Sequence, residues 1–161
     1  KDGRFTTAVV DGSLNKGVAG LFTSARAGAD GTIHVAWINS SFGRLLYKAI
    51  AGGMIPPAAE VIDDGQRPDG VHPVGGGAAL WSDGSQVKVA YQDQRLSDLV
   101  VGTRANGVWS HAPASQGAAG YGFYPRIVAD GGKQYVVQLV IDRAAAAMGK
   151  PLGAIQISAL P

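Results

Sequence analysis

The sequence predicts an all-β protein made of about three antiparallel units, each with four short strands. Two observations carry this prediction. Strong helix formers are scarce, since the 161 residues include a single Glu against 24 Gly and 8 Pro, while Val, Ile and Thr recur in short runs. The chain also repeats itself, because Asp30-Gly-Thr-Ile-His-Val-Ala-Trp-Ile-Asn39 returns as Asp83-Gly-Ser-Gln-Val-Lys-Val-Ala-Tyr-Gln-Asp93.

Each unit opens on a predicted hairpin. Asp-Gly pairs begin at Asp30, Asp83 and Asp130, which lie 53 and 47 residues apart, and each pair separates two β-rich runs. The turn of a tight hairpin needs positive φ, which Gly adopts at little cost. We therefore expect antiparallel strands on both sides of each pair, with second strands over 33–39, 87–93 and 134–142.

The remaining strands follow the same order. Third strands are expected at 45–50, 99–104 and 152–157, and fourth strands at 58–63 and 107–112. The last unit has no fourth run of its own, but Phe5–Asp11 is similar to Ala59–Asp63. We expect one β-repeat domain over 1–161, with units at about 18–65, 74–115 and 120–161. The strand 5–11 is expected to close the last unit, because a closed edge avoids aggregation.

One stretch departs from the strand pattern. Asp142-Arg-Ala-Ala-Ala-Ala-Met-Gly-Lys-Pro151 begins with an N-cap residue and ends with Gly149 and Pro151. These start and stop signals predict about two helical turns, inserted into the hairpin of the third unit.

Four short strands in about 50 residues are typical of a β-propeller blade. An antiparallel β-sandwich is the alternative, since sandwiches also have short strands at regular spacing. Three blades are fewer than the four to eight of a closed ring. The expected partners are therefore further blades, from another chain or from a second copy of this one.

A resemblance to a known protein family also favours propeller blades. The segments Val89–Asp93, Asp98–Leu99, Asn106–Trp109 and Gly120–Tyr124 resemble β-propeller repeats of large secreted or surface proteins of bacteria, notably myxobacteria. The resemblance implies an exported protein, secreted or at the cell surface, with a binding or architectural role. It transfers no catalytic residue, because Ser82-Asp83-Gly84 departs from the Asp-box of sialidase-type propellers.

Several classes of function are disfavoured by composition. The net charge of +2 is scattered, whereas nucleic-acid binding needs a basic face. No apolar run reaches the roughly 20 residues of a membrane span. Cys is absent and His34, His72 and His111 are not at metal-ligand spacing, so neither a metal nor a cofactor is expected. The acidic stretch 63–70 lacks the terminal Glu of an EF-hand and is interpreted as a turn between units.

Candidate ligand-binding residues lie at equivalent strand ends. Asn39, Asp93 and Asp142 end the second strands of the three units, and Arg95 and Arg143 follow two of them. Such groups at one level can bind a polyol or an ion along a shared channel. Alternatively, each side chain caps the turn that follows it.

Aromatic residues in a Gly-rich stretch form the second candidate set. Tyr121, Phe123 and Tyr124 alternate with Gly, and aromatic rings stack on sugars; the alternative is that they pack inward. We expect a non-enzymatic binding or assembly module with a glycan or protein ligand. Two alternatives stay open: a glycan-active hydrolase with carboxylates near Asp93 and Asp142, or a subunit that completes the ring of a larger enzyme.

Overall fold

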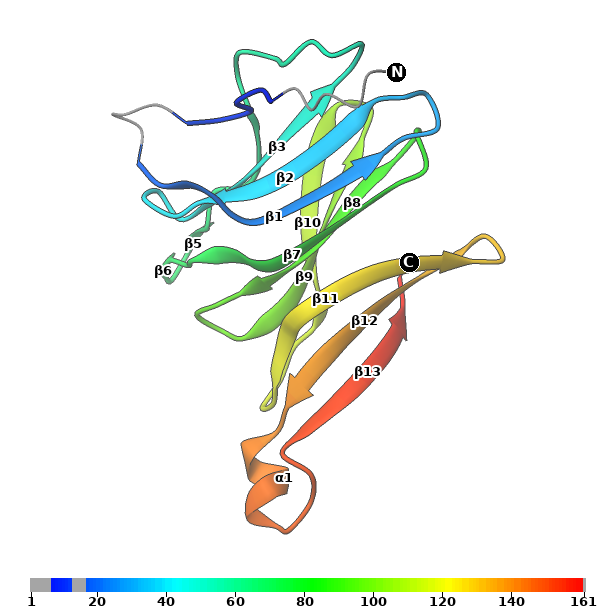
Figure 1. The fold of residues 1–161 in the computed structure, drawn as a ribbon. Coiled ribbons are helices and arrows are strands. Elements are labelled where there is room, and N and C mark those ends of the chain that lie inside the picture. The colour runs from blue at the N-terminus through cyan, green and yellow to red at the C-terminus, as the bar shows by residue number, and fades with distance from the viewer. Residues whose placement is uncertain (1–6, 13–16, 161) are drawn as a thin grey trace.

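The computed structural model describes residues 7–12 and 17–160. Its strands form three large antiparallel sheets that follow one another along the chain, and a small two-stranded sheet (Figure 1). The first sheet has the order β1 (Ala19–Ala27), β2 (Ile33–Asn39), β3 (Arg44–Ile50), β4 (Glu60–Asp63). The second is formed by β7 (Val74–Ser82), β8 (Val87–Asp93), β9 (Asp98–Ala105) and β10 (Val108–Ser115). The third consists of β11 (Gly120–Asp130), β12 (Lys133–Ile141) and β13 (Gly153–Ala159).

The all-β prediction and the blade-like sheets are confirmed, and the hairpins lie where the Asp-Gly pairs indicated. Gly31, Gly84 and Gly131 have φ of +79°, +95° and +55°. In the first two turns the Asp side chain accepts hydrogen bonds from the backbone ahead of it: Asp30 from Thr32 N at 3.0 Å, and Asp83 from Ser85 N at 2.8 Å. Local turn chemistry therefore sets where each first strand reverses.

The first strands of the three sheets form an inner row. Strand β7 contacts both β1 and β11, whereas the later strands of each sheet lie progressively farther out (Figure 1). Successive sheets thus pack face to face, like propeller blades arranged around the row of first strands.

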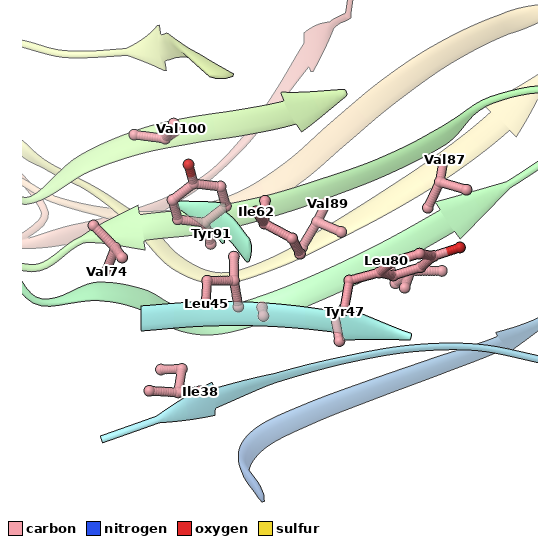
Figure 2. Packing of buried hydrophobic residues seen from close by; sticks show 12 residues of the cluster. Ile38, Leu45, Tyr47, Ile62, Val74, Leu80, Val87, Val89, Tyr91 and Val100 are labelled. Atoms are coloured by element: carbon pink, nitrogen blue, oxygen red, sulfur yellow. The ribbon is translucent and has the colours of Figure 1, made fainter. Parts of the chain in front are cut away.

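The core lies between the sheets. Tyr47 of β3 and Tyr91 of β8 are fully buried in the cluster between the first two sheets (Figure 2). A second cluster joins the second and third sheets through Trp81, Leu99 and Val136. Burying a side chain of this size stabilises the fold by about 1.5–3 kcal/mol. The three sheets are therefore held in one body by apolar contacts at both junctions.

The predicted insertion is confirmed as a short helix. Helix α1 (Arg143–Ala147) begins after Asp142, whose Oδ1 accepts a hydrogen bond from Ala145 N at 2.9 Å. Gly149, with φ of +74°, follows its end. A small hairpin between the first two sheets, β5 (Gln66–Arg67) and β6 (Gly70–Val71), was not predicted.

The expectation that Phe5–Asp11 closes the last blade is wrong for the described part of that segment. Residues 7–12 form no strand, and β13 pairs with β12 alone among the described strands. Asp11 Oδ2 instead accepts from Trp37 Nε1 at 2.9 Å, and Val10 O accepts from Lys48 Nζ at 2.7 Å. These donors on β2 and β3 hold the segment on the first sheet. Phe5 and Thr6 lie outside the described residues.

No helix in the described part of the chain is long and apolar enough to cross a membrane.

Candidate functional site: a pocket at the inner-strand bulges

The three inner strands share an irregularity. Each contains two register shifts against its second strand, which mark β-bulges. Within each bulged stretch a Gly with positive φ is followed two residues later by a second residue with positive φ: Gly20 and Phe22, Gly75 and Gly77, Gly122 and Tyr124. The bulges therefore repeat at one level of the inner row.

Two of these residues are strained aromatics. Phe22 and Tyr124 have φ of +50° and +49°, a conformation that bulky side chains rarely adopt. Phe22 is 50% exposed and Tyr124 is 70% exposed, so burial of the rings offsets the strain only in part. Strain of this kind costs about 1–3 kcal/mol per residue and clusters at binding and catalytic sites.

The bulges line a shallow hollow of about 110 Å³, here called the bulge pocket. Phe22 comes from β1, Gly76 and Gly77 from β7, and Phe123 and Tyr124 from β11. Gly77 takes the place in the repeat that aromatics hold in the flanking strands. A Cβ on Gly77 would lie 3.0 Å from Pro125 Cδ and 3.2 Å from Tyr124 N, so the close approach of β7 and β11 requires glycine.

Two amide side chains complete the lining of the pocket. Gln92 Nε2 donates to Tyr121 O at 2.5 Å, which ties the bulge of β11 to the end of β8. Gln94 is exposed, and its amide lies over Gly76, where an added Cβ would be 2.6 Å from Nε2. A primary amide offers both donors and an acceptor, which matches the hydroxyl groups of a polyol.

The aromatic residues singled out from sequence divide between two environments. Phe123 and Tyr124 line the bulge pocket. Tyr121 packs against the core between the second and third sheets, and its N–H donates to Ser97 O at 2.6 Å. Phe123 also borders a neighbouring hollow of about 310 Å³, which includes Arg143.

The residues at the ends of the second strands do not line the bulge pocket. Asn39 belongs to the first sheet and its backbone carbonyl accepts from Phe42 N at 3.3 Å. Asp93 Oδ1 accepts from Arg95 N at 3.1 Å and from Leu96 N at 3.2 Å. Asp142 caps α1. The two carboxylates thus satisfy the amides of the turns that follow them.

Asp93 also belongs to a buried ionic network at the crossing from the first to the second sheet. His72, 1% exposed, lies between two carboxylates: Nδ1 is 2.6 Å from Asp93 Oδ2, and Nε2 is 3.0 Å from Asp69 Oδ1. The hydrogen bond with Asp93 raises the pKa of His72, since a positive charge on the ring is favoured there. Arg95 NH2 lies 3.8 Å from Asp69 Oδ2 at the exposed end of this network.

Asp63 is the second buried carboxylate of the network. It accepts from both terminal nitrogens of Arg67, at 3.0 and 2.6 Å, and from Tyr91 Oη at 2.7 Å. Burial alone would raise the pKa of Asp63, but these bonds and that from Gly65 N outweigh it, so the pKa lies below its usual value. The network therefore fastens the β5–β6 hairpin to the ends of β4 and β8.

The described residues contain no group of three or more His, Cys, Asp or Glu side chains placed to hold a metal ion. The acidic stretch 63–70 instead directs its buried carboxylate toward Arg67 and Tyr91.

Sequence reasoning missed Phe22, Gly77, Gln92 and Gln94. One signal was present: the triplets Gly20-Leu-Phe, Gly75-Gly-Gly and Gly122-Phe-Tyr stand at the start of each first strand. The first and third residues of each triplet have positive φ. The sequence does not reveal this conformation where the third residue is aromatic, because aromatic residues rarely adopt positive φ.

Comparison with known proteins supports the architecture. No family model and no curated protein matches the sequence. Among solved structures, a thermostable family-43 glycoside hydrolase superposes with a TM-score of 0.60 at 10% identity, over 86% of this chain. The fold is β-propeller-like. This chain covers 54% of the length of that structure, whose family has a five-bladed propeller. At such low identity the likeness concerns the fold alone.

Proposed function

We propose that this protein is a non-enzymatic carbohydrate-binding module of an exported bacterial protein, and that it holds a sugar ring in the bulge pocket. One observation carries the proposal: the exposed aromatics Phe22 and Tyr124 are kept at positive φ on the strands that flank Gly77. The fold retains this strain although the rings do little for the core. A role in ligand binding explains its retention.

The chemistry of the pocket suits a sugar. Aromatic faces pack against the C–H groups of a pyranose, and Phe22, Phe123 and Tyr124 supply aromatic rings to the lining of the pocket. Gln94 supplies an exposed amide for ring hydroxyls. No carboxylate lines the pocket among the described residues, so it favours binding over hydrolysis. The structural neighbour is a glycoside hydrolase, which agrees with a glycan ligand.

A panel of oligosaccharides on a glycan array, followed by calorimetry on the positive ones, tests the proposal. Phe22→Ala should lower affinity by about two- to tenfold, because a specific aromatic contact contributes about 0.5–1.5 kcal/mol. Phe42→Ala is the matched control, since Phe42 is equally exposed at 56% but lies in the β2–β3 turn. Equal affinities of both variants for the sugar would show that the bulge pocket is not the binding site.

A hydrolase is the second candidate, favoured by the pair Asp93 and Asp98. The two residues face each other in the register of β8 and β9. Burial, then the negative charge of Asp93, raises the pKa of Asp98, as expected of a general acid. Asp142, the other carboxylate that the sequence suggested for a hydrolase, does not belong to this pair, since it caps α1.

Chromogenic glycosides distinguish the two candidates. The binding proposal predicts no turnover above background by the wild type. Turnover that disappears in Asp98→Asn would establish the hydrolase and contradict a purely binding role.

A further inference from the structure

The third sheet exposes a face that its two counterparts bury. Pairing registers make Tyr47 of β3, Val101 of β9 and Ile155 of β13 equivalent, because they lie opposite Ala36, Ala90 and Leu139 of the second strands. Tyr47 is fully buried against the second sheet, and Val101 packs on the cluster shared with the third. Ile155 is 74% exposed.

The exposed apolar surface extends along the sheet. Ile157 is 63% exposed and lies opposite Val137, while Val128 is 44% exposed and lies opposite Tyr135. We call this surface the open face; it comprises Val128, Val137, Leu139, Ile155 and Ile157. Contiguous apolar patches of this kind mark interaction sites. In this molecule the two equivalent faces are covered by another antiparallel sheet, so a β-sheet is the occupant that the internal junctions indicate.

The opposite end of the row of sheets is already covered. Val35 and Trp37 of the first sheet face away from the second sheet and are 8% and 2% exposed. Val10, Ile55 and Ala59 of the same chain pack over them. The described part of the molecule therefore has one open blade face rather than two, and head-to-tail addition of further copies is blocked at the covered end.

We propose that the open face is the contact between two copies of this chain, related by a two-fold axis. Strand β13 contains no charged residue, so two open faces meet there without like-charge repulsion. Arg126 lies opposite Val137, but its NH1 donates to Pro125 O at 2.7 Å within its own strand. Two sheets packed face to face bury such side chains at a spacing of about 10 Å.

A two-fold contact is self-limiting. The same patch of each copy is buried in a single interface. Such two-fold dimers are the commonest homo-oligomers. With one open face per copy, association stops at the dimer. One edge of β13 pairs with no described strand and lies beside this contact, where a second copy shields it from edge-to-edge aggregation.

Sedimentation velocity of the purified chain, from micromolar to hundreds of micromolar, tests the proposal. The expected species has twice the 16.5 kDa chain mass. Ile157→Lys should convert it to a monomer, whereas Val108→Lys should leave the dimer intact. Val108 is the matched control, being 69% exposed on the outer strand β10 of the second sheet. Circular dichroism verifies folding, and Ile157→Thr, which keeps a β-branched side chain, replaces Ile157→Lys if the latter unfolds.

Cysteine cross-linking locates the contact, because the chain has no native Cys. At least one of Ile155→Cys and Ile157→Cys should give a covalent dimer with a short bis-maleimide, and Val108→Cys should not. A monomer at all concentrations would overturn the proposal. So would a dimer that persists in Ile157→Lys, since the contact would then lie elsewhere. Larger open-ended assemblies would contradict the single open face.

Discussion

The ionic network and the bulge pocket both lie at the ends of strands, but their side chains differ in burial and in backbone strain. In the network, the buried groups Asp63, His72 and Asp93 all have short partners, with distances of 2.6–3.0 Å. In the pocket, Phe22 and Tyr124 are exposed and held in an unfavourable backbone conformation. The contrast separates polar groups that serve the fold from aromatic groups that the fold supports at a cost.

The comparison predicts that variants in the two regions change stability in opposite directions. Network variants should destabilise without affecting sugar binding. Pocket variants at the strained aromatics should weaken sugar binding while leaving stability unchanged or improved.

The largest expected effect follows from Asp63→Ala. This change leaves Arg67 and Tyr91 Oη without their buried acceptor, which should lower the free energy of unfolding by about 3–5 kcal/mol. Urea unfolding measures it. Asp64→Ala is the neighbouring control, because Asp64 is exposed and its carboxylate accepts from the nearby backbone N–H of Gln66. A loss as small as that of the control would show that the network does not hold the crossing.

Gly77→Val should have the next largest effect. Valine must adopt φ near +65° and place its Cβ 3.0 Å from Pro125 Cδ, so the variant should lose about 1–3 kcal/mol. Gly131→Val forces the same backbone strain, but beyond its chain neighbours no atom of the described residues lies within 4 Å of its Cβ position. A similar loss for both would mean that the close approach of β7 and β11 is unimportant. The difference between their melting temperatures measures the contribution of the close approach.

The network also predicts a dependence of stability on pH. The pKa of His72 is raised in the fold above its unfolded value near 6.5. The folded state therefore binds the proton more tightly, and this contribution is fully present below pH 6.5 and is lost as pH rises through the folded pKa. Urea midpoints measured across this range should fall with rising pH in the wild type. The fall should be smaller in His72→Gln; identical slopes would contradict the role of His72.

The smallest expected effect is a gain. Tyr124→Gly removes the positive-φ strain and gives up little packing, because the ring is 70% exposed. The greater flexibility of glycine in the unfolded chain offsets part of this gain. The net stabilisation should therefore be about 0.5–1 kcal/mol. The same variant should lose sugar affinity. A loss of stability would instead give the ring a structural role and weaken the case for the pocket.

Sequence reasoning succeeded where structure depends on neighbouring residues. The turns at Gly31 and Gly84 and the cap at Asp142 follow from the preferences of a few adjacent positions. It failed for Phe5–Asp11, whose described part is placed by Trp37 and Lys48 from distant strands. Likeness between two strand-like runs does not specify which sheet a segment joins.

The candidate site was predicted only in part for the same reason. Phe123 and Tyr124 were found from their Gly-rich context, and both line the pocket. Phe22 and Gly77 come from other sheets, and only the packing of three inner strands brings them together. Asp93 was noted for its repeated position, but its partner His72 lies 21 residues away. Such a pairing leaves no local signal in the sequence.

The most direct test of the central claim is an NMR titration of the isotope-labelled protein with the best-binding oligosaccharide from the glycan panel. The account predicts progressive shifts of the Phe22 and Tyr124 ring signals and of the Gly76 and Gly77 amides, while the His72 and Asp63 signals stay unchanged. Shifts centred on the ionic network, or none at saturating sugar, would contradict a sugar site at the inner-strand bulges.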